Sequence, residues 1–335
     1  MFRTSSASIA CFLAASSLLL VSGCSSNGTG GGSGGGSTTS GGLAAGGAAS
    51  VYIVDDSGTV GVVQRYVAGA NGATTPSATI ALPSGFEDND LKVDTSSGIY
   101  VAGTTSGGLG EVIYYPSGAT APSQTLNLAN PYAALGLDNS NNIYVIDASG
   151  TGTVSVYPTT ATGSATPTRT FTSSLLASLD IYAATADGSG NVYVAGVTST
   201  SANEVLVFAA GATGTPSPTR TLTLTAVPYG VTVDTAGDIF VSENTGTAAA
   251  FIAEYTGTAS SPAKTITLTG NTASLIGGIS VDGVGNLYGL LDTDVNSTDS
   301  FSIVALAPSL TGSVAPTRQM TSTSIVDPDV EVAAR

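Results

Sequence analysis

PYGVTVDTAGDIFVSEN, residues 228–244, predicts two short antiparallel strands joined by a tight turn. Apolar and polar residues alternate through 231–233, and a second apolar run follows at 239–241. Between them, the Asp234 side chain can accept hydrogen bonds from backbone two residues further on, and Gly237 supplies the positive φ that a tight turn needs. The stretch is therefore expected to form a β-hairpin.

Variants of this hairpin recur through residues 50–335 at intervals of 44 to 49 residues. A third apolar strand and a short fourth strand, which opens with Pro, follow each copy. Four short strands per repeat of this length, without helical periodicity, predict a β-propeller. We therefore expect an all-β fold, a six-bladed propeller of four-stranded blades. The second-strand aromatic residues are Tyr52, Tyr100, Tyr144, Tyr193, Phe240 and Tyr288, and the turn Asp residues, six positions earlier in five copies, are Asp94, Asp138, Asp187, Asp234 and Asp282.

The first repeat begins directly with its second strand at 51–54, so its innermost strand is missing from the N-terminal side. The C-terminal segment DPDVEVAAR, residues 327–335, has the pattern of an innermost strand. Pairing of this segment with 51–54 would remove a sheet edge. We expect it to close the ring.

The residues before the repeats read as a targeting segment. Arg3 precedes an apolar run at 9–21 that is too short to span a bilayer stably. The run ends in Leu-Val-Ser-Gly before Cys24, which resembles a bacterial lipobox. The resemblance implies cleavage before Cys24 and lipidation of that residue, and Ser25 resembles the pattern for sorting to the outer membrane. An ordinary signal peptide with an incidental Cys is the alternative.

Three segments follow from this interpretation. Residues 1–23 are expected to be a lipoprotein signal peptide. Residues 24–49 are expected to be the lipidated Cys with a Gly/Ser-rich flexible tether, because chains of this composition behave as random coils. Residues 50–335 are the propeller. The expected location is the bacterial cell envelope, anchored to the outer membrane.

The blade pattern G-[VIL]-x-V-D-x-x-G-[ND]-[IVL]-[YF]-V resembles the NHL-type and related bacterial envelope propeller repeats over residues 50–335. Repeats 4 to 6 match best, and the third has Asn141 and Asn142 where the turn Gly would stand. The resemblance implies the propeller fold. It does not select a function, because such propellers include lyases, lactonases and interaction modules.

Composition excludes several chemistries. The chain has no His and only two Cys, one of which leaves with the signal segment. A Ser-His-Asp triad is therefore impossible, and metal sites that depend on His are disfavoured. With 8 basic and 23 acidic residues, the net charge is −15, which makes nucleic acid an unfavourable partner.

The charged residues that recur in the repeats are expected to have structural roles. The turn Asp residues are expected to cap their own turns. The cations at the start of the fourth strands (Arg169, Arg220, Lys264, Arg318) are expected to be solvated edge charges.

Acidic residues concentrate on one predicted face, where loops between second and third strands and connections between blades emerge. Eleven of the 23 acids fall there, around blades 6, 1 and 2. Asp292, Asp294 and Asn296 have the 1,3,5 spacing of a calcium loop, although the Gly and Glu expected further on are absent. Ca²⁺ bound by these residues and Asp299 is one interpretation; a solvated acidic loop is the other. The remaining acids proposed for this face are Asp55, Asp56, Glu87, Asp88 and Asp90, together with Asp327, Asp329 and Glu331.

Three tyrosines are predicted to flank the channel mouth on the same face. Tyr132, Tyr182 and Tyr229 each stand five or six residues before a turn Asp. Tyr offers a rigid amphipathic surface to a sugar or a peptide, and packing between blades is the alternative. Strand alternation also points Lys92 and Glu331 toward the channel, which predicts an ion pair between adjacent innermost strands.

The preferred hypothesis is a monomeric, non-enzymatic binding module, held at the membrane by its N-terminal lipid, with an envelope protein or glycan as its partner. Innermost strands that offer mainly Gly, Thr and Ser, such as Gly136 and Thr232, favour binding over hydrolysis. One alternative is a Ca²⁺-dependent, lactonase-like hydrolase that uses carboxylates of the acidic face. A structural spacer is the other.

Overall fold

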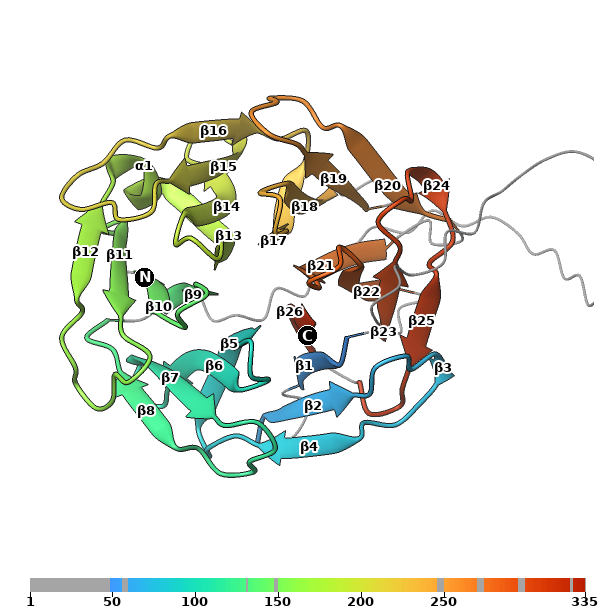
Figure 1. The fold of residues 1–335 in the computed structure, drawn as a ribbon, viewed down its shortest axis with the longest axis horizontal. Coiled ribbons are helices and arrows are strands. Elements are labelled where there is room, and N and C mark those ends of the chain that lie inside the picture. Colours follow the sequence, from blue (N-terminus) through green and yellow to red (C-terminus); the bar gives the residue numbers. More distant parts are fainter. Residues whose placement is uncertain are drawn as a thin grey trace, which may run out of the picture. The chain divides into compact units, whose positions relative to one another are not determined.

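In the computed structural model, residues 49–55, 60–130, 132–147, 150–245, 250–269, 274–294, 299–325 and 328–334 are described. Contacts divide the chain after Thr39, and all described residues belong to the second unit, Ser40–Arg335. Within this unit six antiparallel sheets follow one another in a ring (Figure 1). The all-β, six-bladed propeller is confirmed.

Each blade contains four antiparallel strands, which run in order from the innermost to the outermost. Blades 1 to 3 are β26 (Pro328–Ala334), β1 (Val51–Asp55), β2 (Val62–Tyr66) and β4 (Ala78–Ala81); β5 (Phe86–Val93), β6 (Ile99–Thr105), β7 (Gly110–Tyr115) and β8 (Gln124–Asn127); and β9 (Tyr132–Leu137), β10 (Ile143–Asp147), β11 (Thr153–Tyr157) and β12 (Arg169–Thr172).

Blades 4 to 6 are β13 (Leu179–Ala186), β14 (Val192–Thr198), β15 (Asn203–Phe208) and β16 (Arg220–Thr223); β17 (Val227–Val233), β18 (Ile239–Asn244), β19 (Phe251–Tyr255) and β20 (Lys264–Leu268); and β21 (Ser274–Val281), β22 (Leu287–Asp294), β23 (Asp299–Leu306) and β25 (Arg318–Thr321). A short helix, α1 (Ser174–Ala177), connects blades 3 and 4, and β3 (Gly72–Ala73) and β24 (Gly312–Val314) lie in loops.

The C-terminal strand closes the ring as predicted. β26 pairs antiparallel with β1, with Val51 opposite Ala334 and Ile53 opposite Val332 (Figure 1). The entering chain is also tied to blade 6, because the Ala49 N–H donates to the Tyr288 hydroxyl at 3.1 Å. Both ends of the propeller therefore meet at the junction of blades 6 and 1.

The apolar core is distributed over the interfaces between blades. In the part of the chain that the structure describes, buried apolar residues form six clusters, each shared by two neighbouring blades. Between blades 6 and 1, for example, Ile53 and Tyr66 pack with Ile303. The innermost strands approach closely where they carry Gly: a Cβ on Gly230 would lie 2.9 Å from the Gly277 carbonyl oxygen of the next blade. The fold thus buries its apolar surface between repeats, as stacked repeat proteins do.

A second connection between blades runs along the outer edge. The loop before the fourth strand adds a parallel segment to the outermost strand of the preceding blade: β24 pairs with β20, and β3 pairs with β25. Single bridges at Gly163 and Gly214 do the same for blades 3 and 4. In each case the bridging segment begins at, or consists of, a Gly with φ between 58° and 72°, a left-handed conformation that favours Gly.

Loop length decides where this connection forms. In blades 1, 3, 4 and 6 twelve positions separate the last residue of the third strand from the first of the fourth, whereas blades 2 and 5 have nine. Among the described residues, no parallel bridge is found from the two short loops. A difference of three residues in loop length therefore decides whether the loop pairs with the outermost strand of the preceding blade.

Two faces of the ring follow from the strand directions. The turns between first and second strands lie on one face, which we call the turn face. The loops between second and third strands, and the connections between blades, lie on the opposite connection face. Val51 begins β1 opposite Ala334, so the chain enters on the turn face. In the described part of the chain, no helix is long and apolar enough to cross a membrane.

Candidate functional site

The five turn Asp residues cap their own turns, as predicted. In every copy Oδ1 accepts hydrogen bonds from the backbone N–H groups two and four residues further on, at 2.7–3.1 Å. In blades 3, 4 and 6 Oδ2 also accepts from an Asn side chain and from the second-strand Tyr hydroxyl, as Asp187 does from Asn191 and Tyr193. These carboxylates border a central cavity of about 160 Å³ on the turn face, but the Oδ1 atom of each is used in its own turn.

The innermost strands share a β-bulge on the side toward the connection face. The ladder skips the residue five positions before each turn Asp, which is Asn89, Ala133, Tyr182 or Tyr229, and in blade 6 the same irregularity includes Gly277. Bulges redirect side chains and are frequent beside functional sites. In blades 2 to 5 the bulge therefore places one variable residue at the same level of the innermost strand.

Two of the three predicted tyrosines come together at these bulges. The rings of Tyr182 and Tyr229 lie 5.6 Å apart in an edge-to-face arrangement, and Tyr182 is 41% exposed. Tyr132 stands one position earlier, in the ladder opposite Asp147, and its side chain lies outside the described residues. The structure thus brings Tyr182 and Tyr229 together, and the place of Tyr132 beside them stays a prediction.

The acids expected on loops around blade 2 lie in a strand instead. Glu87, Asp88 and Asp90 belong to β5. Asp90 is 2% exposed, and its carboxylate accepts hydrogen bonds from Lys92 at 2.5 Å and from the Leu135 N–H of blade 3 at 2.6 Å. Burial raises the pKa of Asp90, while Lys92 and the N–H group act against this rise. Asp90 therefore joins two blades.

The side chains of Asp88 and Glu331 lie outside the described residues, so the predicted pair of Lys92 with Glu331 stays a prediction.

The acids of blades 6 and 1 lie at or near strand ends. Asp292 and Asp294 belong to β22, and Asp299 belongs to β23, where it pairs with Asp294. Asp55 ends β1 and is 1% exposed. Cys24, Asp56, Asn296 and Asp327 lie outside the described residues, as do the side chains of Asp294, Asp299 and Asp329. Within the described ranges, no group of three His, Cys, Asp or Glu residues is arranged to hold a metal ion.

The cations that open the outermost strands are not the solvated edge charges expected. All four are partly buried and donate to backbone carbonyls of the next blade. Arg169 reaches Ala212 at 3.0 Å, and Arg220 reaches Gly257 at 2.7 Å and Ala259. Lys264 reaches Pro308 at 3.5 Å and also pairs with Glu254, and Arg318 reaches Ala70 at 3.4 Å. The expectation was wrong because it treated each blade alone, without the neighbouring loop.

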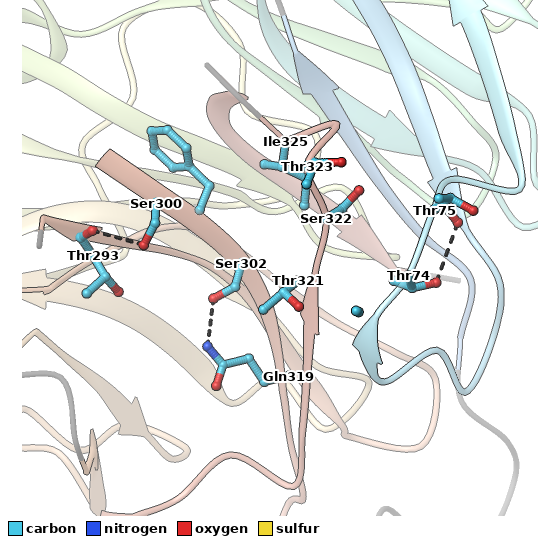
Figure 2. Close-up of a pocket in the computed structure, with 12 residues that line it drawn as sticks. Thr74, Thr75, Thr293, Ser300, Ser302, Gln319, Thr321, Ser322, Thr323 and Ile325 are labelled. Atoms are coloured by element: carbon cyan, nitrogen blue, oxygen red, sulfur yellow. Dashed lines mark hydrogen bonds between the residues drawn. The ribbon is translucent and has the colours of Figure 1, made fainter. Parts of the chain in front are cut away.

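A groove of about 890 Å³ lies between blades 6 and 1, on the side of the connection face. β22, β23 and β25 supply one wall, and the loop after β3 supplies the other (Figure 2). Eight of the twelve described residues that line it carry a hydroxyl group, and none of these twelve is charged. The lining consists of Ala73, Thr74, Thr75, Thr293, Ser300, Phe301, Ser302, Gln319, Thr321, Ser322, Thr323 and Ile325.

Hydrogen bonds hold this groove open while leaving polar atoms available. The Gln319 amide donates to the Ser302 hydroxyl at 2.9 Å (Figure 2), and the Thr74 N–H donates to the Thr321 carbonyl at 2.9 Å across the two blades. Within the described residues, the hydroxyls of Thr293, Thr321 and Thr323 donate to no other group. Fixed walls with unused donors and acceptors are the features of a site for a polar ligand.

A second groove, of about 700 Å³, lies at the equivalent place between blades 2 and 3. Thr105 corresponds to Thr293 and Glu111 to Ser302 when the repeats are aligned on their second-strand and third-strand residues. Ten of the twelve lining positions agree in this way. We call the two sites groove 6/1 and groove 2/3. Groove 2/3 is lined by Thr105, Leu109, Gly110, Glu111, Asn127, Leu128, Ala129, Tyr157, Ser164, Ala165, Thr166 and Pro167.

Neither groove is predicted from the sequence. A signal for them exists, because both occur beside a long loop whose Gly precedes the fourth strand by six positions, namely Gly72 and Gly163. The long loop indicates a groove only once it is known to pair in parallel with the outermost strand of the preceding blade, and a hydrophobic pattern does not reveal that pairing.

No protein-family model matches the sequence, and no curated protein matches it significantly. Among solved structures, the chain is similar to a protein of unknown function from Bacteroides caccae, with a TM-score of 0.61, 9% identity, and coverage of 86% of this chain and 98% of that one. A lower similarity is found to the β-propeller domain of Cps50 (Swd1) from Myceliophteria thermophila, with a TM-score of 0.40, 10% identity, and coverage of 69% and 68%. The protein is a six-bladed β-propeller, and at this identity the similarity concerns the fold alone.

Proposed function

We propose that this propeller is a non-enzymatic binding module of the NHL-type class, anchored in the bacterial envelope by a lipid on Cys24, and that groove 6/1 binds a neutral glycan. The observation that carries the proposal is the lining of this groove: eight hydroxyl-bearing residues, Gln319 and Phe301, with no charged side chain among the described residues that line it. Sugars are bound by hydroxyl and amide groups that exchange hydrogen bonds with them, beside an aromatic ring that packs on their apolar faces.

The position of the groove supports this role. The chain enters the propeller at Ala49 on the turn face, whereas groove 6/1 lies toward the connection face. Attachment of the chain through its N-terminal side would therefore leave the opposite side of the propeller, with groove 6/1, open to a ligand.

Binding to neutral oligosaccharides tests the proposal. The full chain, purified in detergent, is applied to an array of neutral hexose and N-acetylhexosamine oligosaccharides, and the strongest binder is titrated by calorimetry. Gln319→Ala and Thr321→Ala are expected to weaken binding by about tenfold each, because each removes a hydrogen-bonding group from the groove.

Asn127→Ala is the matched control for Thr321→Ala, since it changes the same repeat position in groove 2/3. It is expected to leave the oligosaccharide affinity within about twofold. Failure of every oligosaccharide to bind, or equal affinities of the groove 6/1 variants and the unaltered protein, would exclude the proposal.

A further inference from the structure

Groove 2/3 has the framework of groove 6/1 but a different chemistry. At three equivalent positions Ser300, Ser302 and Ser322 of groove 6/1 are replaced by Leu109, Glu111 and Leu128. The polar lining thus becomes one carboxylate between two leucines. Two grooves of the same architecture with different linings indicate two different ligands.

The carboxylate of Glu111 is available for a ligand. It is partly buried, and among the described residues no side chain or backbone group donates a hydrogen bond to it or forms an ion pair with it. Burial raises its pKa, because the surrounding protein disfavours the charged form. No Lys or Arg is found among the described residues that line the groove, so none of them neutralises this carboxylate.

The walls beside Glu111 are apolar and accessible. Leu109, near the tip of the hairpin between β6 and β7, is 50% exposed, which is unusual for a large apolar side chain in this chain. Leu128 is buried, and Ala165 and Pro167 come from the loop of blade 3 that forms the opposite side. The exposed Leu109 has room to pack against a hydrocarbon segment that enters between the blades.

We propose that groove 2/3 binds a primary ammonium group carried on an aliphatic stem, with the stem packed against Leu109 and the ammonium paired with Glu111. An ammonium ion supplies both the positive charge and the hydrogen-bond donors that this carboxylate lacks, and charge-assisted hydrogen bonds are stronger than neutral ones. The stem covers apolar surface that is otherwise exposed to water. The lysine side chain of a peptide and a free aliphatic diamine share this chemistry.

Calorimetric titrations of the full chain with two probes test the proposal and separate the two sources. One probe is the blocked peptide acetyl-Gly-Lys-Gly-amide, and the other is 1,6-diaminohexane. Binding of the peptide identifies a lysine side chain as the ligand, and binding of the diamine alone identifies a free amine. The peptide acetylated on its lysine is not expected to bind, because it has lost the charge.

Variants locate the site. Glu111→Gln is expected to weaken binding at least tenfold, and Leu109→Ala about threefold to tenfold. Glu204→Gln is the matched control: Glu204 occupies the same position in blade 4, but the loop of blade 5 beside it is three residues shorter. It is expected to change the affinity less than twofold. Failure of both probes to bind at 10 millimolar (about the weakest affinity of interest), equal binding of the acetylated peptide, or an unchanged affinity of Glu111→Gln would overturn the proposal.

Discussion

The Arg220 guanidinium donates to the carbonyl oxygen of Gly257 at 2.7 Å, across the interface between blades 4 and 5. A second hydrogen bond from the same group reaches Ala259. This interface has the short loop, and no parallel bridge is found there among the described residues. The side chain thus provides between these blades an outer-edge connection like the one that backbone pairing provides where the loop is long.

Replacement of Arg220 by Ala should therefore destabilise the propeller. The loss of two charge-assisted hydrogen bonds to backbone predicts a decrease of about 2 kcal/mol in the free energy of unfolding, measured by chemical denaturation. Arg65→Ala, which removes an exposed cation that bonds to Ser50, is the control and should cost less than about 1 kcal/mol. Equal effects of the two substitutions would contradict a special role for Arg220.

The turn Asp residues should differ in their contributions. Asp187 accepts four hydrogen bonds, two of them from the Asn191 and Tyr193 side chains, whereas Asp234 accepts two from backbone. Asp187→Ala should therefore lower the free energy of unfolding by about 1–2 kcal/mol more than Asp234→Ala does. Thermal and chemical denaturation of the two variants check this. A larger loss at Asp234 would show that the side-chain donors contribute little.

Stability should fall in alkaline solution. Burial, and then the Asp138 carboxylate, raise the pKa of Tyr144 to about 12, and the same causes, with Asp187 or Glu243, raise the pKa of Tyr193 and Tyr255. Since the unfolded chain ionises near pH 10, the stabilisation is complete below pH 10 and is lost as the pH rises toward the folded pKa, by roughly 1.4 kcal/mol per pH unit for each Tyr.

Chemical denaturation between pH 9 and 12 measures this loss, and the ultraviolet absorbance of tyrosinate follows the ionisation. Tyr144→Phe should reduce the slope above pH 10, because it removes one of the groups. The Tyr182→Phe variant is the control, because Tyr182 is exposed. An unchanged slope for Tyr144→Phe would exclude this Tyr as a source.

Removing Lys92 alone should destabilise the protein more than replacing both Lys92 and Asp90. Lys92→Ala leaves the Asp90 carboxylate buried without its cation, and breaking a buried pair in this way costs about 3 kcal/mol. The pKa of Asp90 then rises further above its unfolded value, so the stability of this variant should recover as the pH falls through the folded pKa. The double variant Asp90→Asn/Lys92→Met should regain much of the loss. A Lys92→Ala variant with unaltered stability would rule out this interpretation.

The repeat predicts much of the fold because each blade uses the same local signals. The Asp that caps the turn, as in Asp187, and the aromatic residue six positions later identify every hairpin but the split one, and the pattern of the C-terminal segment identifies the closing strand. These features depend on hydrogen bonds and burial within one repeat or between adjacent ones, so they leave a trace in the local sequence.

The sites depend on relationships that the local sequence does not contain. The bulge at Tyr182 and Tyr229 is a property of strand register, and the sequence shows only that both stand five positions before an Asp. Groove 6/1 joins Thr74 to Thr321, residues from opposite ends of the propeller that become neighbours on closure of the ring. For the same reason, the partners of Arg169 and Arg220 are carbonyl groups, which carry no residue identity that a pattern could reveal.

The common bulge of the innermost strands has a consequence for how such a protein can diversify. Because the skipped residue contributes no ladder pairing with its neighbouring strand, Asn, Ala and Tyr all occupy it without a change in register. Substitutions there should be nearly neutral for folding while they alter what the mouth of the channel displays. The scaffold thereby separates the positions that can evolve new specificity from those that maintain the ring.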